Sequence, residues 1–122
     1  MKTQKRIEND FGPEVKSLFK ALLKVGFQID DIDNGRDYEE ESVESFKWDG
    51  NIDNAVKEAV ACDEAQVLVS INCKSYWMLL VLGNSPGELV NDFTCNQELE
   101  AVVDAHSNKW FGRRQPTKEY NA

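Results

Sequence analysis

The sequence has few of the residues that zinc and redox sites need. Its 122 residues include one histidine and three cysteines, and no two cysteines form a C-x-x-C pair. A structural zinc site takes four nitrogen or sulfur ligands at short, regular spacings, which this set does not provide. We therefore expect the chain to hold no metal and no cofactor.

Long apolar runs are missing as well. The basic start of the chain leads directly into Ile7-Glu-Asn-Asp10, so the apolar core of a secretory signal is absent. No segment approaches the roughly 18 apolar residues of a membrane-spanning helix. Together with the odd number of cysteines, this predicts a cytoplasmic protein that does not bind membranes.

Positive charge is scarce and negative charge is concentrated in one segment. The net charge is −8, and residues 29–64 carry thirteen acidic and three basic side chains. This balance disfavours direct binding of nucleic acid. Crowded carboxylates repel one another unless they reach into solvent or meet a cationic partner. The densest part spans residues 30–44 and contains Asp30, Asp31, Asp33, Asp37, Glu39, Glu40, Glu41 and Glu44.

A calcium loop is a poor explanation of this acidic segment. With Gly35 at the sixth position of an EF-hand loop, Asp30 takes the first position and Glu41 the twelfth. The third position is then Ile32, which has no ligand oxygen, and the eighth is Asp37, where a small apolar residue is usual. We expect either a solvated acidic hairpin or a contact surface.

The first half of the chain predicts two helices and two strands. Gly12-Pro13 marks a helix start, and the apolar stripe from Val15 to Leu23 continues to a stop at Gly26. A strand over residues 27–31 precedes Asn34-Gly35, a strong hairpin signal, with a partner strand over 43–48. A second helix follows over 52–61.

The second half predicts a three-stranded antiparallel meander over residues 66–71, 76–82 and 88–94. Its central strand is apolar on both sides, with Trp77, Leu79 and Val81 forming a second apolar face. A capping box, Thr94-x-x-Gln97, begins the last helix, which ends at Gly112. The expected fold is α+β, in the order α-β-β-α-β-β-β-α with the helices mainly on one face. It occupies residues 11–112, between a flexible N-terminus (1–10) and a basic flexible tail (113–122).

Two groups of polar residues have alternative interpretations. His106 lies on the apolar stripe of the last helix, which is typical of a structural histidine; a catalytic unit with Cys95 or Asp104 is the alternative. Lys16, Lys20 and Lys24 recur every four residues, as expected of a solvated helix face, with contact to an acidic partner as the alternative.

One stretch resembles known proteins. The segment Trp77-Met-Leu-Leu-Val-Leu-Gly-Asn-Ser-Pro-Gly-Glu-Leu-Val-Asn-Asp-Phe-Thr94, followed by a helix to Trp110, is similar to small uncharacterised proteins of bacterial phages and plasmids. The resemblance implies an accessory protein of a mobile element. It contains no catalytic motif and assigns no functional residue.

These observations favour a non-enzymatic protein that presents its acidic hairpin, about residues 30–44, to a basic partner such as a nucleic-acid-binding protein. One alternative is a small-ligand-binding or hydrolytic protein that uses carboxylates and His106. Another is a structural protein that associates, for instance as a homodimer, through Trp77, Leu79 and Val81.

Overall fold

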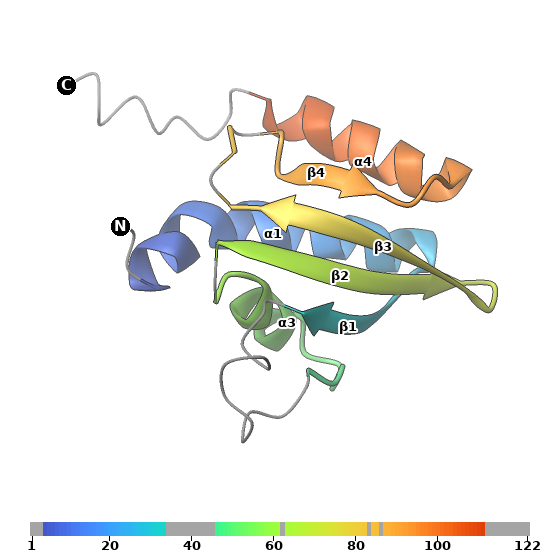
Figure 1. Cartoon of the computed structure of the whole chain (residues 1–122), viewed down its shortest axis with the longest axis horizontal. Coiled ribbons are helices and arrows are strands. Elements are labelled where there is room, and N and C mark those ends of the chain that lie inside the picture. Colours follow the sequence, from blue (N-terminus) through green and yellow to red (C-terminus); the bar gives the residue numbers. More distant parts are fainter. Residues whose placement is uncertain (1–3, 34–45, 62, 83, 86, 112–122) are drawn as a thin grey trace.

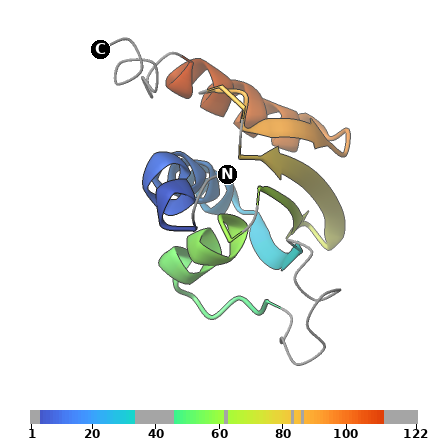
Figure 2. The ribbon, with the colours of Figure 1, turned by 60° about the vertical axis from the view of Figure 1, so that its left-hand side comes forward.

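The computed structural model describes residues 4–33, 46–61, 63–82, 84–85 and 87–111, which form two layers. In chain order the elements are α1 (Gln4–Val25), β1 (Gln28–Asp33), α3 (Ile52–Ala59), β2 (Glu64–Ile71), β3 (Lys74–Val81), β4 (Val90–Phe93) and α4 (Gln97–Trp110) (Figure 1). The strands form one antiparallel sheet, and the helices cover one of its faces (Figure 2). The predicted α+β class and one-sided arrangement of helices are confirmed.

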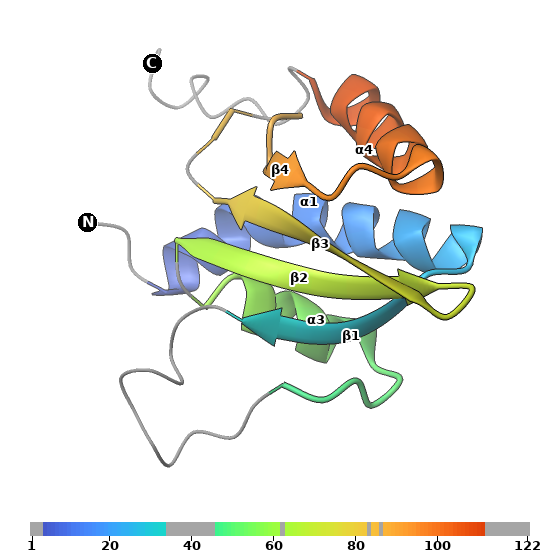
Figure 3. The same ribbon diagram turned by 45° about the vertical axis from the view of Figure 1, so that its right-hand side comes forward.

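The sheet has the strand order β1-β2-β3-β4, so neighbours in sequence are neighbours in space (Figure 3). The predicted meander is present as β2, β3 and β4, and β1 pairs with β2 to make it four strands wide. Residues 46–48 of the predicted partner strand 43–48 are not in a strand, and the rest lies outside the described residues.

The turn between β2 and β3 contains only two residues. Ile71 pairs with Lys74, and Asn72 and Cys73 between them have φ angles of 52° and 64°. Positive φ at both positions is the mark of a type I′ turn, whose twist matches that of the flanking strands. A four-residue turn was predicted here, and β3 therefore begins two residues earlier than expected.

Helix α1 begins earlier than the sequence predicted. It starts at Gln4 and contains Pro13, which was predicted to lie in its first turn. Proline has no amide hydrogen to donate to the preceding turn, but the rest of the helix holds the chain in place through its buried apolar stripe. That stripe includes Val15, Leu18, Phe19 and Leu22, as expected.

Two asparagine side chains begin the other helices. The Asn51 side chain accepts a hydrogen bond from the Asp53 amide at the start of α3, and Asn96 accepts one from the Leu99 amide at the start of α4. The prediction that Thr94 caps the last helix is wrong. Its hydroxyl instead accepts a hydrogen bond from the Trp77 amide at 3.1 Å, which joins the end of β4 to β3.

The core lies between the two layers. Helix α1 packs against both α3 and α4, and α3 also contacts β1 and β2. The sheet contributes the inward residues of each strand, among them Ile29, Val67, Met78 and Leu80. Within the described ranges, no helix combines the length and the hydropathy that crossing a lipid bilayer requires.

Candidate functional site

The face of the sheet that carries no helix presents an ordered set of side chains, which we call the open face. Opposed residues of an antiparallel pair point to the same side of the sheet. The register therefore forms four cross-strand rows on this side. The rows are Gln28, Ser70 and Ser75; Asp31, Leu68 and Trp77; Asp33, Gln66, Leu79 and Asp92; and Glu64 and Val81.

A β-bulge adds one more carboxylate to the open face. The pairing of β1 with β2 shifts between Ile29 and Asp31, so Asp30 has no partner of its own and shares a position opposite Leu68 with Asp31. Asp30 is exposed, whereas Ile29 and Ile32 on either side of the bulge are buried. The bulge thus keeps both isoleucines in the core and places two acids beside Leu68.

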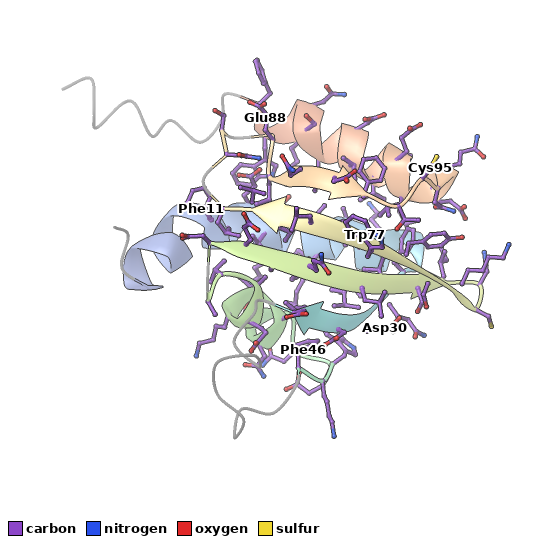
Figure 4. The ribbon with its side chains drawn as sticks, in the orientation of Figure 1. Phe11, Asp30, Phe46, Trp77, Glu88 and Cys95 are labelled. Carbon is purple, nitrogen blue, oxygen red and sulfur yellow. The ribbon has the colours of Figure 1, made fainter. Side chains whose placement is uncertain are left out.

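Apolar side chains occupy the middle of the open face. Trp77 is 39% exposed and its cross-strand partner Leu68 is 37% exposed, while Leu79 and Val81 are half-buried. Figure 4 shows Trp77 in front of β3, with Asp30 on the β1 side of the same face. Single exposed apolar residues are ordinary, but four neighbours on adjacent strands form a contiguous patch.

Carboxylates flank this patch on three sides. Asp30, Asp31 and Asp33 line it along β1, Asp92 lies on β4, and Glu64 lies at the start of β2. None of the described residues that the register puts on the open face is basic. This arrangement combines an apolar centre, which water solvates poorly, with a margin of a single charge sign.

The structure brings together two groups of residues that were predicted as separate features. The acids Asp30, Asp31 and Asp33, predicted to contact a partner, lie on the same face as Trp77, Leu79 and Val81, predicted to self-associate. The remaining predicted contact residues lie outside the described part of the chain: Asp37, Glu39, Glu40, Glu41 and Glu44.

A second polar site lies inside the protein. Glu14 of α1 is fully buried, and its Oε2 atom lies 2.9 Å from Nε2 of His106 on α4. The same oxygen accepts a hydrogen bond of 3.2 Å from the backbone amide of Gly87, in the β3–β4 connection. One carboxylate oxygen therefore joins three separate parts of the chain. This site was not predicted, because Glu14 directly follows the helix-start signal Gly12-Pro13, where an acidic side chain is ordinary.

His106 has the position expected of a structural histidine. It is 4% exposed, and its ring stacks on Trp110 with 6.3 Å between ring centroids. Neither catalytic partner considered from the sequence reaches it. Cys95 lies before the start of α4. Nine helical residues precede His106 in α4, which corresponds to about 14 Å along the helix axis between the two positions. Asp104 is exposed and lies two positions away, on another side of the helix.

Metal-binding geometry is also lacking within the ranges that the structure describes. No three side chains of histidine, cysteine, aspartate or glutamate come together there in a way that could hold an ion. Comparison with known proteins adds no assignment: no family model matches the chain, and no curated protein or solved structure gives a significant match.

Proposed function

We propose that the protein acts as a binding module without catalytic activity, and that its open face contacts a basic, amphipathic segment of a partner protein. The observation that supports this proposal most directly is the combination of exposed Trp77 with carboxylates on both sides of it. We therefore place the centre of the contact on the sheet, and not on the acidic hairpin that the sequence predicted.

Trp77 has the properties of an anchor residue. Tryptophan is enriched among the few interface residues that contribute most of the binding free energy, because its large side chain loses much apolar surface to water on binding. Leu68 and Leu79 lie beside it on neighbouring strands and would complete the apolar centre of the contact. The rigid sheet holds all three in position before a partner arrives, which limits the entropy lost on binding.

The carboxylates supply selectivity for the sign of the partner's charge. Acids at the margin of an interface accelerate the approach of a cationic partner and disfavour anionic ones. Each exposed ion pair contributes little to the binding free energy and is screened by salt. Selectivity therefore depends on the whole set of acids, namely Asp30, Asp31, Asp33, Glu64 and Asp92. A basic partner such as a nucleic-acid-binding protein suits this surface.

The same charges argue against symmetric self-association through the open face. In a twofold dimer, each copy uses the same surface patch. Two acidic margins would then approach each other with no basic residue of the described open face between them. A second copy is therefore a poorer occupant than a basic partner, and sedimentation at two protein concentrations would detect it.

The test uses a synthetic peptide that alternates lysine or arginine with leucine or tryptophan, labelled for fluorescence anisotropy. A matched peptide carries glutamate in place of each basic residue. We expect the whole chain to bind the basic peptide and not the acidic one. We also expect the affinity to fall between about 50 mM and about 200 mM salt, because exposed charges are screened over that range.

Two variants with the same change of net charge locate the binding. The first is Asp30→Asn with Asp31→Asn and Asp92→Asn on the open face, and the second is Glu98→Gln with Glu100→Gln and Asp104→Asn on the exposed side of α4. The open-face variant should bind the basic peptide about tenfold more weakly or worse. The α4 variant should bind nearly as the parent does. Equal losses in both would show that only the net charge matters.

A third variant, Trp77→Ala, separates apolar from electrostatic contributions. Its loss of affinity should be similar at both salt concentrations, because the burial of apolar surface is not screened. If the parent and Trp77→Ala bind equally well, Trp77 is not the anchor and the proposed contact is wrong.

A further inference from the structure

A cleft lies between α1 and α4, on the flank of α1 that does not face the sheet. Its volume is about 540 Å³, within the range of roughly 300–1,000 Å³ that is usual for small-molecule sites. The two helices pack against each other on the helical side of the molecule (Figure 2). The lining of the cleft includes Pro13, Lys16, Lys20, Lys24, His106 and Lys109.

The cleft concentrates positive charge on an acidic protein. It contains four of the seven lysines whose side chains the structure describes, and none of its lining residues is acidic. Lys16, Lys20 and Lys24 follow one another at four-residue intervals, which corresponds to a row of about 12 Å along α1. Lys109 faces this row from α4: its Nζ donates a hydrogen bond of 3.1 Å to the Ser17 hydroxyl.

Most of these ammonium groups have no acidic partner within the described part of the chain. Lys16 forms an ion pair of 2.9 Å with Asp53 on α3. No comparable ion pair involves Lys20, Lys24 or Lys109 among the described residues. Like charges held in one cleft repel one another, and an anion bound between them would relieve that repulsion.

One buried side chain, His106, also borders the cleft. His106 lines it although the residue is only 4% exposed, and Glu14 fixes the ring through Nε2. The other ring nitrogen, Nδ1, is buried and has no hydrogen-bond partner among the described residues. Buried polar atoms without a hydrogen-bond partner are uncommon in proteins. The His106 side chain that carries this atom borders the cleft.

We propose that this cleft binds a small phosphorylated organic molecule. Phosphate groups would lie against Lys20, Lys24 and Lys109, because lysine ammonium groups bind phosphate oxygens as compact point charges. The organic part would pack on Pro13, Ala21 and the lysine stems. A phosphate brings up to two charges in a small volume, whereas an acidic peptide brings one per residue and would extend beyond a cleft of this size.

The experiment titrates the whole chain by calorimetry with ATP, inorganic pyrophosphate, adenosine and a hexaglutamate peptide, without divalent cations. Two variants of equal charge change are compared. Lys20→Gln with Lys24→Gln alters the cleft, and Lys57→Gln with Lys74→Gln removes two exposed lysines elsewhere. Circular dichroism checks that each variant is folded.

We expect pyrophosphate and ATP to bind, with ATP tighter because of its organic part, and adenosine alone to bind weakly or not at all. The cleft variant should lose about tenfold or more in affinity for ATP, and the control variant should change by less than about twofold. Amide NMR shifts on adding ATP should map to residues 16–24 and 105–109.

Three results would overturn the assignment. The first is that neither phosphate compound binds at millimolar concentration in low salt. The second is that both lysine variants lose affinity equally, which would indicate diffuse attraction to surface charge. The third is that hexaglutamate binds more tightly than ATP and depends on Lys20 and Lys24, which would identify an acidic peptide as the ligand.

Discussion

Gly87 is the position where a single methyl group should reveal how the β3–β4 connection and α4 fit together. An added Cβ would lie 2.8 Å from the carbonyl oxygen of Ser107 and 2.9 Å from the amide nitrogen of Phe111. These two atoms are already joined by a hydrogen bond at the end of α4. Because both belong to the backbone, the methyl group can be accommodated only by moving the helix end or the loop.

Gly50 offers a matched control for Gly87→Ala. Both glycines have φ of +87°, so alanine meets a similar left-handed strain of about 1–2 kcal/mol at either position. The gain from a less flexible unfolded chain, about 0.4–1 kcal/mol, is also similar. Nothing lies within 4 Å of a Cβ at Gly50. The difference between the two variants therefore isolates the steric contact, which we expect to cost about 1–3 kcal/mol.

Urea unfolding followed by circular dichroism measures this difference. With a slope of about 1–3 kcal/mol per molar urea, Gly87→Ala should unfold at a midpoint roughly 1 M below that of Gly50→Ala. Unchanged slopes would show that the comparison is one of stability alone. If the two variants lose the same free energy of unfolding, the end of α4 does not approach Gly87 as closely as described, and the reasoning fails.

Three further predictions concern single interactions. Glu14→Met and His106→Leu should each lower the free energy of unfolding by about 3–5 kcal/mol, since each leaves a buried polar partner behind. In urea unfolding, the loss in the double variant should be smaller than the sum of the two single losses by at least about 1 kcal/mol. Cys73→Gly should raise the free energy of unfolding by up to about 1 kcal/mol, as it relieves left-handed strain in the β2–β3 turn; a lower thermal midpoint would contradict this. The pKa of Asp49 lies below its usual value because the carboxylate accepts hydrogen bonds, first from the Asn51 amide and then from the Asn54 side chain. The Asp49 carboxylate therefore contributes its full stabilisation above the unfolded pKa of about 3.9, and this stabilisation is lost as the pH falls through the lower folded pKa. NMR of the carboxyl carbon measures the folded pKa directly. A folded pKa of about 3.9 or higher would refute the assignment.

Apolar periodicity predicted most of the fold. The alternation that includes Val67 and Val69 places one side of β2 in the core, and the stripe from Val15 to Leu22 does the same for α1. These patterns depend only on local spacing, which the sequence contains in full. The α+β class and the β2-β3-β4 meander followed from them directly.

Element ends were predicted less well because several residues can perform the same local task. Pro13 is common at a helix start, yet here it lies inside α1. Thr94 and Asn96 can both cap α4, and the hydroxyl of Thr94 is instead engaged by the Trp77 amide. Competition of this kind is decided by tertiary contacts, which local sequence does not contain.

The sequence predicted individual residues of the open face, but not how they are grouped. The sequence predicted the acids of β1 and the apolar residues of β3 as separate features, and only the strand register placed Asp31 and Trp77 in one row. Glu14 pairs with His106 from a distance of ninety-two residues, and no spacing rule links them. The resemblance of residues 77–110 to phage and plasmid proteins stays a prediction.

The central claim, that the open face is the binding surface, is tested most directly by amide chemical-shift mapping with the basic amphipathic peptide. We expect the shifts to concentrate at Leu68, Trp77, Leu79 and Asp92, and the exposed side of α4 to be unaffected. The matched acidic peptide should cause no such shifts. Shifts confined to the helices, or no shifts at a peptide concentration that saturates the anisotropy signal, would contradict it.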